Sequence, residues 1–308
     1  MARLMLVANP AASQFTGGDH RSILRTLTRR HRVEAVWPHS AEDARTIAAD
    51  AVTAGFDGVV AMGGDGIVHQ VAQSLIGTEV YLAVLPAGTT NVFARQVGLP
   101  SKSTKAARLL AGDVSFNPWP VVSVDFTLEN GDRDYRHALF ATGVGLDADV
   151  VAAAETEPYR KYRFGAVHYA RTAIGMLWSD LRRRAPEIEV EAEGRTTSVI
   201  GVMAQFHSAF TYFGRSSLRF TAEHPDPMTL LAVERLPMRR LPGLLRRIFT
   251  ASLGEMKGLQ VWTGVKSFSV ASGQPARLQM DGEVVGSVTS AGFTYRADSL
   301  WVVGPPPV

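Results

Sequence analysis

Short apolar runs alternate with helical patterns along the first third of the chain. Polar or glycine-rich residues follow each run, and apolar residues then recur at the spacing of one helix face. Strands separated by helices in this way are typical of a parallel sheet covered on both faces. The expected strands are residues 4–8, 33–36, 58–62 and 81–86, and helices are expected over residues 20–30, after Ser40, after Gly66 and from Asn91.

The helix after Ser40 has a recognisable start. Asp43 follows Ser40 by three residues, a spacing typical of a helix N-cap. Apolar residues then recur at helical spacing, so one face is expected to pack on the sheet. These residues are Ala44, Ile47, Ala48, Ala51 and Val52.

The pattern changes after about residue 117, where Asn-Pro-Trp-Pro interrupts it. Residues 121–128 alternate with period two, and Asn130-Gly131 predicts a hairpin before a strand at about residues 136–140. We therefore expect a second domain that is mostly antiparallel β. Its later alternating segments are residues 188–194, 199–206, 229–236, 265–272, 276–285 and 293–303, and helical insertions are expected near residues 164–182 and 238–254.

Composition limits the partners and the compartment. The 308 residues carry a net charge of +3, which is too mild to indicate nucleic acid, and they include no cysteine. The N-terminus runs directly into a strand pattern, and no apolar run approaches the roughly 18 residues that cross a bilayer. We therefore expect a cytoplasmic protein whose contact with membranes is peripheral.

The turn Gly63-Gly64-Asp65-Gly66 has the chemistry of an anion site. Glycines allow positive φ and a close approach of ligand to backbone, and the first amides of the following helix carry the positive end of its dipole. A carboxylate at Asp65 would repel a phosphate unless it holds a cation or caps the turn. Four residues alone leave an anion site and a plain tight turn equally open.

Two further loops favour the ligand. Residues 85–100 repeat the arrangement of strand end, glycine turn and helix start, with Thr89, Thr90 and Asn91 in the turn, and Asn9-Pro10 ends the first strand. The carboxyl ends of parallel strands meet at one edge of a sheet, where open α/β folds bind ligands. Three polar loops on that edge indicate a nucleotide site.

Five segments together carry a family resemblance. They are ANP at residues 8–10, GGDG at 63–66, LPAGTTNVFAR at 85–95, ATGVGLDADVV at 141–151 and MDGE at 280–283. In this order they resemble the diacylglycerol kinase family, which includes soluble bacterial diacylglycerol kinases and the sphingosine and ceramide kinases. The more distant NAD kinases share GGDG, but their later asparagine-glutamate and serine-threonine-rich motifs are not found here.

The resemblance implies a two-domain lipid kinase with its active site between the domains. An N-terminal three-layer α/β domain would span residues 1–117, rejoined by 294–308, and an antiparallel β-sandwich for the lipid would span 118–293. ATP and Mg²⁺ would be required. Residues implied in nucleotide binding are Asn9, Pro10, Ser40, Gly63, Gly64, Asp65, Gly66, Ile67, Gly88, Thr89, Asn91 and Glu283.

Asp281 matches the family's general base, which would accept the proton of the lipid hydroxyl as its oxygen attacks the γ-phosphate. Without the resemblance, Asp281-Gly282 is better interpreted as a hairpin turn. Asp65 would be a second catalytic residue that organises Mg²⁺. Further residues implied near metal are Asp125 and, where relatives hold a structural magnesium, Glu223 and Asp226; Asp147 matches a frequent family aspartate or caps the following helix.

Several positions depart from the family pattern. The loop after Asn9-Pro10 differs, and Ile67 and His69 replace a threonine and an asparagine, as in sphingosine-kinase-like branches. Gln70 replaces a glutamate and removes a charge, so we expect a reduced rate. In residues 224–231, Pro227 stands where relatives carry glycine, which weakens the structural metal site.

Access to a bilayer is expected from residues 234–254, where five arginines lie among apolar residues. A helix packed on the β domain with a solvated basic face explains this segment equally well, and Arg182, Arg183 and Arg184 form a second basic cluster. The expected partners are a lipid substrate, the membrane surface and a second copy in a homodimer, with no nucleic acid.

The sequence thus predicts an ATP- and Mg²⁺-dependent kinase acting on a lipid hydroxyl, most simply converting diacylglycerol to phosphatidic acid. The alternatives are a catalytically weak lipid- or nucleotide-binding regulator, a kinase of a sphingoid or other hydroxyl lipid, and a kinase of a soluble polyol or nucleotide.

Overall fold

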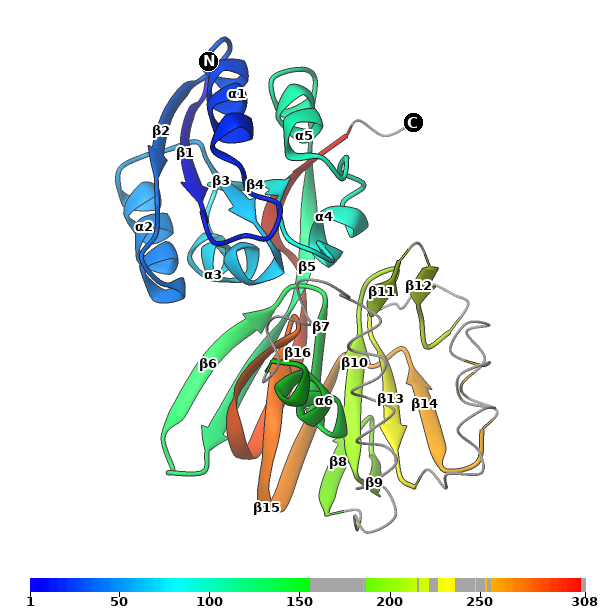
Figure 1. Cartoon of the computed structure of the whole chain (residues 1–308). Helices are drawn as coiled ribbons and strands as arrows, with labels where there is room; N and C mark the ends of the chain where they lie inside the picture. The colour runs from blue at the N-terminus through cyan, green and yellow to red at the C-terminus, as the bar shows by residue number, and fades with distance from the viewer. Residues whose placement is uncertain are drawn as a thin grey trace. The chain divides into compact units, whose positions relative to one another are not determined.

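The computed structural model describes residues 1–155, 185, 187–214, 216–221, 227–235, 247, 253 and 256–305. The chain forms two compact units, one of Met1–Val121 with Ala297–Val308 and the other of Val122–Arg296 (Figure 1). The sequence predicted a division at residues 117 and 293. The assignment of nucleotide to the first part and lipid to the second stays a prediction.

The first unit is an open parallel sheet with helices on both faces. Strands β1–β4 pair in the order β2-β1-β3-β4, and the end of β16 (Glu283–Gly304) adds parallel to β4 through Val302 and Leu82. The elements are β1 (Arg3–Ala8), α1 (Gly17–Leu27), β2 (Arg32–Val36), α2 (Ala41–Thr53), β3 (Gly58–Gly63), α3 (Asp65–Leu75), β4 (Tyr81–Pro86), α4 (Val92–Gln96) and α5 (Ser103–Leu110).

Apolar periodicity places the helices of this unit. Ile23 of α1 and Leu110 of α5 join Leu6 of β1 in one buried cluster, so α1 and α5 cover one face of the sheet. Val7 points to the opposite face and is also fully buried, on the side of α2 and α3. Ser40 caps α2 as predicted, because its hydroxyl accepts the Asp43 amide at 3.1 Å.

The second unit is strand-rich and antiparallel. Its order is β14-β13-β10-β7-β15-β16, with β8 paired to β15 and β9 to β8, and with β5 paired to β16 and β6 to β5. The elements are β5 (Ser115–Leu128), β6 (Arg133–Ala138), β7 (Ala141–Gly145), α6 (Leu146–Glu155), β8 (Ile188–Ala192), β9 (Arg195–Val199), β10 (Gly201–Gln205), β11 (Thr211–Phe213), β12 (Ser216–Leu218), β13 (Thr229–Val233), β14 (Leu259–Thr263) and β15 (Ser267–Met280).

The long strand β15 links two parts of this unit. Its first residues pair with β8 and its last residues pair with β7, across a register shift between Ala271 and Ala276. The inner faces of these strands share one apolar core, in which Phe268 stacks on Phe293 with ring centroids 4.2 Å apart. The predicted α/β and antiparallel β classes are confirmed, as are the hairpins at Asn130-Gly131 and Asp281-Gly282.

Some local predictions were wrong. The Asn-Pro-Trp-Pro segment does not interrupt the pattern, because residues 117–120 lie inside β5. Proline fixes φ at a value that extended backbone also uses, so it removes only a hydrogen-bond donor there. The first helix begins at Gly17 rather than residue 20, because the Thr16 side chain accepts the Asp19 amide. Helix α5 and strands β9, β11, β12 and β14 were not predicted.

Several predictions fall outside the described residues. These are the helical insertion at residues 164–182, nearly all of that at 238–254, and the individual residues Arg182, Arg183, Arg184, Glu223 and Asp226. In the part of the chain that the structure describes, no helix is long and apolar enough to span a membrane.

Candidate functional site

Three loops meet at the carboxyl edge of the sheet in the first unit, as the sequence predicted. The Asn9 amide, after β1, donates to the Met62 carbonyl at 2.9 Å. The Ala87 amide, after β4, donates to the Gly63 carbonyl at 2.8 Å. The loops after β1, β3 and β4 are therefore joined into one rim.

This rim includes the switch point of the sheet. β1 lies between β2 and β3, so the chain leaves β1 in one direction and later returns to its other side. In open α/β sheets the crevice outside the carboxyl ends of the strands at such a point is the usual ligand site.

Glycine is needed in the rim because two backbones nearly touch. A Cβ placed on Gly88 would lie 2.5 Å from the Gly64 Cα, and one on Gly63 would lie 2.3 Å from the Ile67 Cγ2. Gly63, Gly64 and Gly66 do not use the positive φ that glycine allows. Close packing, and not a left-handed backbone, is what requires glycine at positions 63 and 88.

The N-terminus of α3 points its amides into this rim. Gly64 is the N-cap with no side-chain cap, and the first backbone bond of the helix runs from the Val68 amide to the Gly64 carbonyl at 3.3 Å. The amides of residues 65–67 thus lie outside the helix's own ladder, at the positive end of its dipole. The Ile67 side chain is buried, so the predicted nucleotide contact of this residue would be made by its backbone amide.

Asp65 caps a neighbouring helix. Its two carboxylate oxygens accept the amides of Val92 and Phe93, at 2.9 and 3.0 Å, at the start of α4. Asn91 locks the same loop from a left-handed backbone, since its side chain accepts the Gly88 amide at 2.9 Å and donates to the Gly88 carbonyl at 2.7 Å. The alternative that Asp65 caps its own turn was wrong, because Gly64 is the N-cap of α3 and Asp65 caps α4 instead. The role of Asp65 toward metal stays a prediction.

Hydroxyl side chains also lie in the loops at the carboxyl edge of the sheet. The side chains of Ser13 and Thr89 lie within hydrogen-bond distance, 3.1 Å, and link the first loop to the third. The Asn9 side chain accepts the Ala11 amide at 2.9 Å and shapes the first loop. Ser40 lies after β2 and uses its hydroxyl as the cap of α2. Nucleotide contact by these residues and by Pro10 stays a prediction.

Asp281 forms a second, different site in the other unit. It lies in the β15–β16 turn with φ +55° and is 3% exposed. Its Oδ1 accepts the amides of Leu139, Phe140 and Ala141 at 2.9 to 3.2 Å, and its Oδ2 accepts the Leu139 amide at 2.8 Å. The Asp281 amide donates back to the Ala141 carbonyl. The carboxylate is therefore held in one orientation by the backbone before β7.

Gln279 connects this turn to a buried carboxyl. Its Oε1 accepts the Gly282 amide at 3.0 Å, and its Nε2 donates to the Asp147 Oδ2 at 2.7 Å. Burial raises the pKa of Asp147 to about 6, opposed by the Gln279 hydrogen bond and reinforced by the charge of Asp149. Asp147 thus supports the Asp281 turn, whereas the sequence offered it only as a family aspartate or a helix cap.

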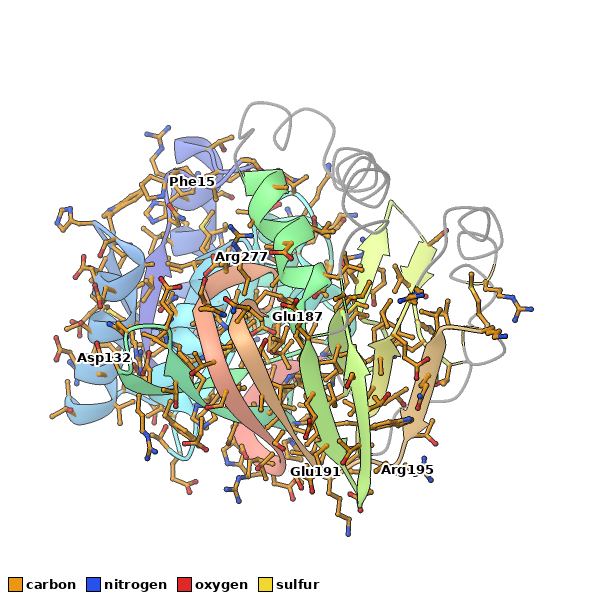
Figure 2. All side chains as sticks on the ribbon, turned by 90° about the horizontal axis from the view of Figure 1, so that it is seen from below. Phe15, Asp132, Glu187, Glu191, Arg195 and Arg277 are labelled. Carbon is orange, nitrogen blue, oxygen red and sulfur yellow. The ribbon has the colours of Figure 1, made fainter. Side chains whose placement is uncertain are left out.

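Sequence reasoning missed Gln279 and Arg277. Arg277, labelled in Figure 2, forms an ion pair at 2.7 Å with Asp149 of α6. Gln279 and Arg277 precede Asp281 by two and four residues, so the period of a strand predicts that they lie on one face at the end of β15. That periodicity was the available signal.

The remaining candidates lie apart from these contacts. Asp125 is exposed on β5, and Glu283 is half-buried just after the turn. Among the described residues, no three His, Cys, Asp or Glu side chains are grouped as a metal site. The predicted metal roles of Asp65 and Asp125 stay predictions, and those of Glu223 and Asp226 lie outside the described residues.

A cavity of about 340 Å³ lies at the opposite end of the sheet, beside Leu4 and Tyr81, where β1 and β4 begin. Leu110 and Gly112 line it at the end of α5, where the helix dipole is negative. Arg30 and His31 are the basic residues of a lining that is otherwise largely apolar, and the cavity is separate from the rim of the three loops.

Comparisons with known proteins match this arrangement. Residues 3–116 match the diacylglycerol kinase catalytic domain. A diacylglycerol kinase of Mycobacterium tuberculosis is 30% identical over 211 residues, which cover 67% of this chain and 64% of that protein. A Pseudomonas putida protein described as "Probable lipid kinase YegS-like" is 41% identical over 159 residues, or 51% of this chain and 48% of that protein.

The fold is shared over nearly the full length with a solved structure. The crystal structure of a diacylglycerol kinase from Bacillus anthracis superposes with a TM-score of 0.70, covering 99% of this chain and 97% of that one at 16% identity. The matching segment of the Mycobacterium relative is slightly less than two thirds of that protein's length. Through residues 3–116, the chain belongs to the diacylglycerol kinase family.

Proposed function

We propose that this protein is an ATP- and Mg²⁺-dependent lipid kinase that phosphorylates a lipid hydroxyl, with diacylglycerol as the simplest acceptor and phosphatidic acid as the product. Membership of the diacylglycerol kinase family and the names of its relatives support the lipid kinase. The observation that carries the proposal is the rim of three joined loops, in which Gly88 and Gly64 pack backbone to backbone.

The rim fits a nucleotide's phosphate groups. Amides at the start of α3 offer donors and a favourable dipole to an anion. Gly88 brings the third loop against the glycine turn, and Asn91 fixes the shape of that loop. Thr89 adds an exposed hydroxyl. These groups would bind the phosphates without a positively charged side chain.

A magnesium ion would neutralise the charge that develops on the transferring phosphate. Mg²⁺ in kinases is held by one or two carboxylates together with phosphates and water, so it requires no cluster of three acidic residues. Asp65 fits this need because its carboxylate lies in the glycine turn itself. Asp125 is the second carboxylate that we propose for the metal.

Asp281 would accept the proton in the transfer step. The lipid hydroxyl oxygen forms a bond to the γ-phosphorus, the bond from that phosphorus to the bridging oxygen breaks, and ADP leaves. The hydroxyl proton passes to a carboxylate oxygen of Asp281, whose orientation is fixed by the amides of residues 139–141. Fixed orientation of the base is what such a step requires.

Three further predictions belong to this proposal. We propose peripheral contact with anionic membrane through residues 234–254, a cytoplasmic location and a homodimer. Binding to vesicles that contain an anionic lipid, compared with neutral vesicles, tests the membrane contact.

Phosphate transfer from radiolabelled ATP to lipids in mixed micelles tests the function. Diacylglycerol, sphingosine and ceramide are offered separately, and we expect transfer to diacylglycerol. Asp281→Asn should lower the rate about 10²- to 10⁴-fold, the usual contribution of a general base. Asp298→Asn is the matched control, since Asp298 is an exposed aspartate that also has positive φ. Undiminished transfer by Asp281→Asn contradicts the mechanism, and no transfer to any lipid contradicts the function.

A second candidate is a lipid- or nucleotide-binding regulator with weak activity. The observation in its favour is the Asp281 carboxylate, which is nearly buried and already accepts three backbone amides. Binding of ATP without turnover on any of the three lipids would support the regulator over the kinase.

A further inference from the structure

Trp37 is an exposed aromatic residue at the end of β2. Its exposed fraction is 42%, and the other exposed large hydrophobic residues in the described parts of the chain are Met1, Phe116, Tyr135 and Trp301. Tryptophan is enriched at binding surfaces, because its indole offers a large apolar area to a partner.

Two rings hold Trp37 in place. Phe15 meets it edge to face with ring centroids 5.4 Å apart, and the His20 ring lies 4.5 Å away. His20 is buried, and its burial lowers its pKa, so the imidazole is neutral at neutral pH. An aromatic cluster of Phe15, His20 and Trp37 therefore forms without a charge, and Trp37 is its exposed member.

The register of the sheet brings this cluster near the glycine turn. Trp37 directly follows Val36, which pairs with Val7 of β1, while Ala8 of β1 pairs with Met62 of β3 on its other side. Trp37 and Gly63 thus flank the end of β1 from opposite sides. Two strand spacings separate them, or roughly 10 Å.

One loop belongs to both the cluster and the rim. Phe15 lies in the loop between β1 and α1 (Figure 2), next to Gln14, whose amide donates to the Ala87 carbonyl at 2.8 Å. Ser13 of the same loop contacts Thr89 of the third loop. The aromatic cluster therefore continues directly into the loops that we assign to phosphate.

We propose that Trp37 stacks on the base of the nucleotide whose phosphates bind the glycine turn and the loop at residues 88–91. This inference rests on the proposed nucleotide site and names the residue that recognises the base. A nucleoside triphosphate is extended, with a flat base at one end and phosphates at the other, which matches an aromatic face beside an amide cradle. Stacking uses the π face that every base has, so adenine and guanine nucleotides should both benefit.

Calorimetric binding to the full chain separates the base from the phosphates. ATP and inorganic tripolyphosphate, which has no base, are each titrated into wild type, Trp37→Ala, Trp37→Phe and Trp301→Ala. Trp301 is the matched control because it is 39% exposed in the same unit and precedes Val302, which pairs near the start of β4 at the other end of the sheet. Trp37→Leu is a second variant, with apolar bulk but no aromatic face.

We expect Trp37→Ala and Trp37→Leu to raise the Kd for ATP about 5- to 150-fold and to leave tripolyphosphate binding unchanged. Trp37→Phe should retain most of the ATP affinity, and Trp301→Ala all of it. The inference is overturned if Trp37→Ala and Trp37→Leu bind ATP like wild type. It is also overturned if their affinity for tripolyphosphate falls as much as their affinity for ATP. Wild type that binds neither ligand would instead contradict the proposed nucleotide site.

Discussion

Backbone amides at the start or end of an element mark a site in both units, but only the second unit supplies its own anion. In the second unit the amides of Leu139, Phe140 and Ala141 point at the chain's own carboxylate on Asp281. In the first unit the amides at the start of α3 face a rim built from glycine, with no side-chain cap on Gly64. The amides of residues 139–141 are satisfied internally by Asp281, whereas those at the start of α3 are where we propose that a phosphate binds. The difference between the two sites is whether the chain itself places a carboxylate opposite the amides.

Removal of the Asp281 carboxylate should have the largest effect on the stability of the second unit. Asp281→Gly keeps the positive φ without strain and leaves three buried amides without their acceptor. Each unsatisfied buried group costs about 1–3 kcal/mol, so the free energy of unfolding should fall by at least about 3 kcal/mol. Denaturant unfolding measures this loss.

A matched control and a rescue accompany that variant. Asp298→Gly removes an exposed aspartate with positive φ and should change the free energy of unfolding by less than about 0.5 kcal/mol. Formate should then stabilise Asp281→Gly and not wild type, because the variant's three amides can donate to the carboxylate of an external anion. Equal stability of Asp281→Gly and wild type would contradict the internal role of the carboxylate.

The complementary change adds a methyl group to the rim of the first unit. In Gly88→Ala the new Cβ meets the Gly64 Cα at 2.5 Å, so the two loops must separate. We expect overpacking to cost about 1–3 kcal/mol of stability. The ATP Kd should rise at least about tenfold. Gly17→Ala is the control in the same unit, since its Cβ would meet nothing within 4 Å. Calorimetry that shows unchanged ATP affinity in Gly88→Ala would exclude this loop from the cradle.

The protonation of Asp147 should make the free energy of unfolding depend on pH. Burial raises its pKa to about 6, above the roughly 3.9 of an unfolded aspartate, so the folded state holds a proton that the unfolded state releases. The stability from the protonated carboxyl is present below about pH 4 and is lost as pH rises to about 6, amounting to about 3 kcal/mol.

Asp147→Asn removes this titration. Its free energy of unfolding relative to wild type should increase by about 1–3 kcal/mol between about pH 4 and pH 7, measured by denaturant unfolding at each pH. Asp298→Asn should track wild type across the same range. A parallel pH dependence of wild type and Asp147→Asn would show that Asp147 does not titrate in this window.

The smallest expected effect concerns Asp65, whose carboxylate lies in the glycine turn of the rim. Asp65→Asn replaces a charged acceptor of the Val92 and Phe93 amides by a neutral one, so α4 loses part of its cap. A cap contributes about 0.5–2 kcal/mol, and we expect a loss of about 1 kcal/mol in the free energy of unfolding. A much larger loss of ATP affinity than of stability would favour the metal role of Asp65 over the capping role.

Local patterns predicted much of this fold. The period of the apolar residues identified the strands of the first unit, and Ser40 with Asp43 identified a helix start. The meeting of three loops was also predictable, because carboxyl ends of parallel strands share an edge. Each of these features depends on residues near one another in sequence or on a general rule of topology.

Contacts between segments that are distant in sequence could not be predicted from local patterns. The acceptor relation between Asp281 and the amides of residues 139–141 joins positions about 140 residues apart. The reason for glycine at Gly88 is the Gly64 backbone, which no local motif indicates. Asp147 looked like a helix cap until the fold placed Gln279 beside it.

Strand β16 decides how this protein can be divided. It begins as the hairpin partner of β15 at Glu283 and ends beside β4 at Val302. A fragment limited to residues 3–116, the span of the family match, would lack this strand and leave the β4 backbone as an open sheet edge. Open edges pair with other chains, so such a fragment should aggregate during expression. Any truncation intended to isolate the first unit must therefore join residues 297–308 back onto residues 1–121.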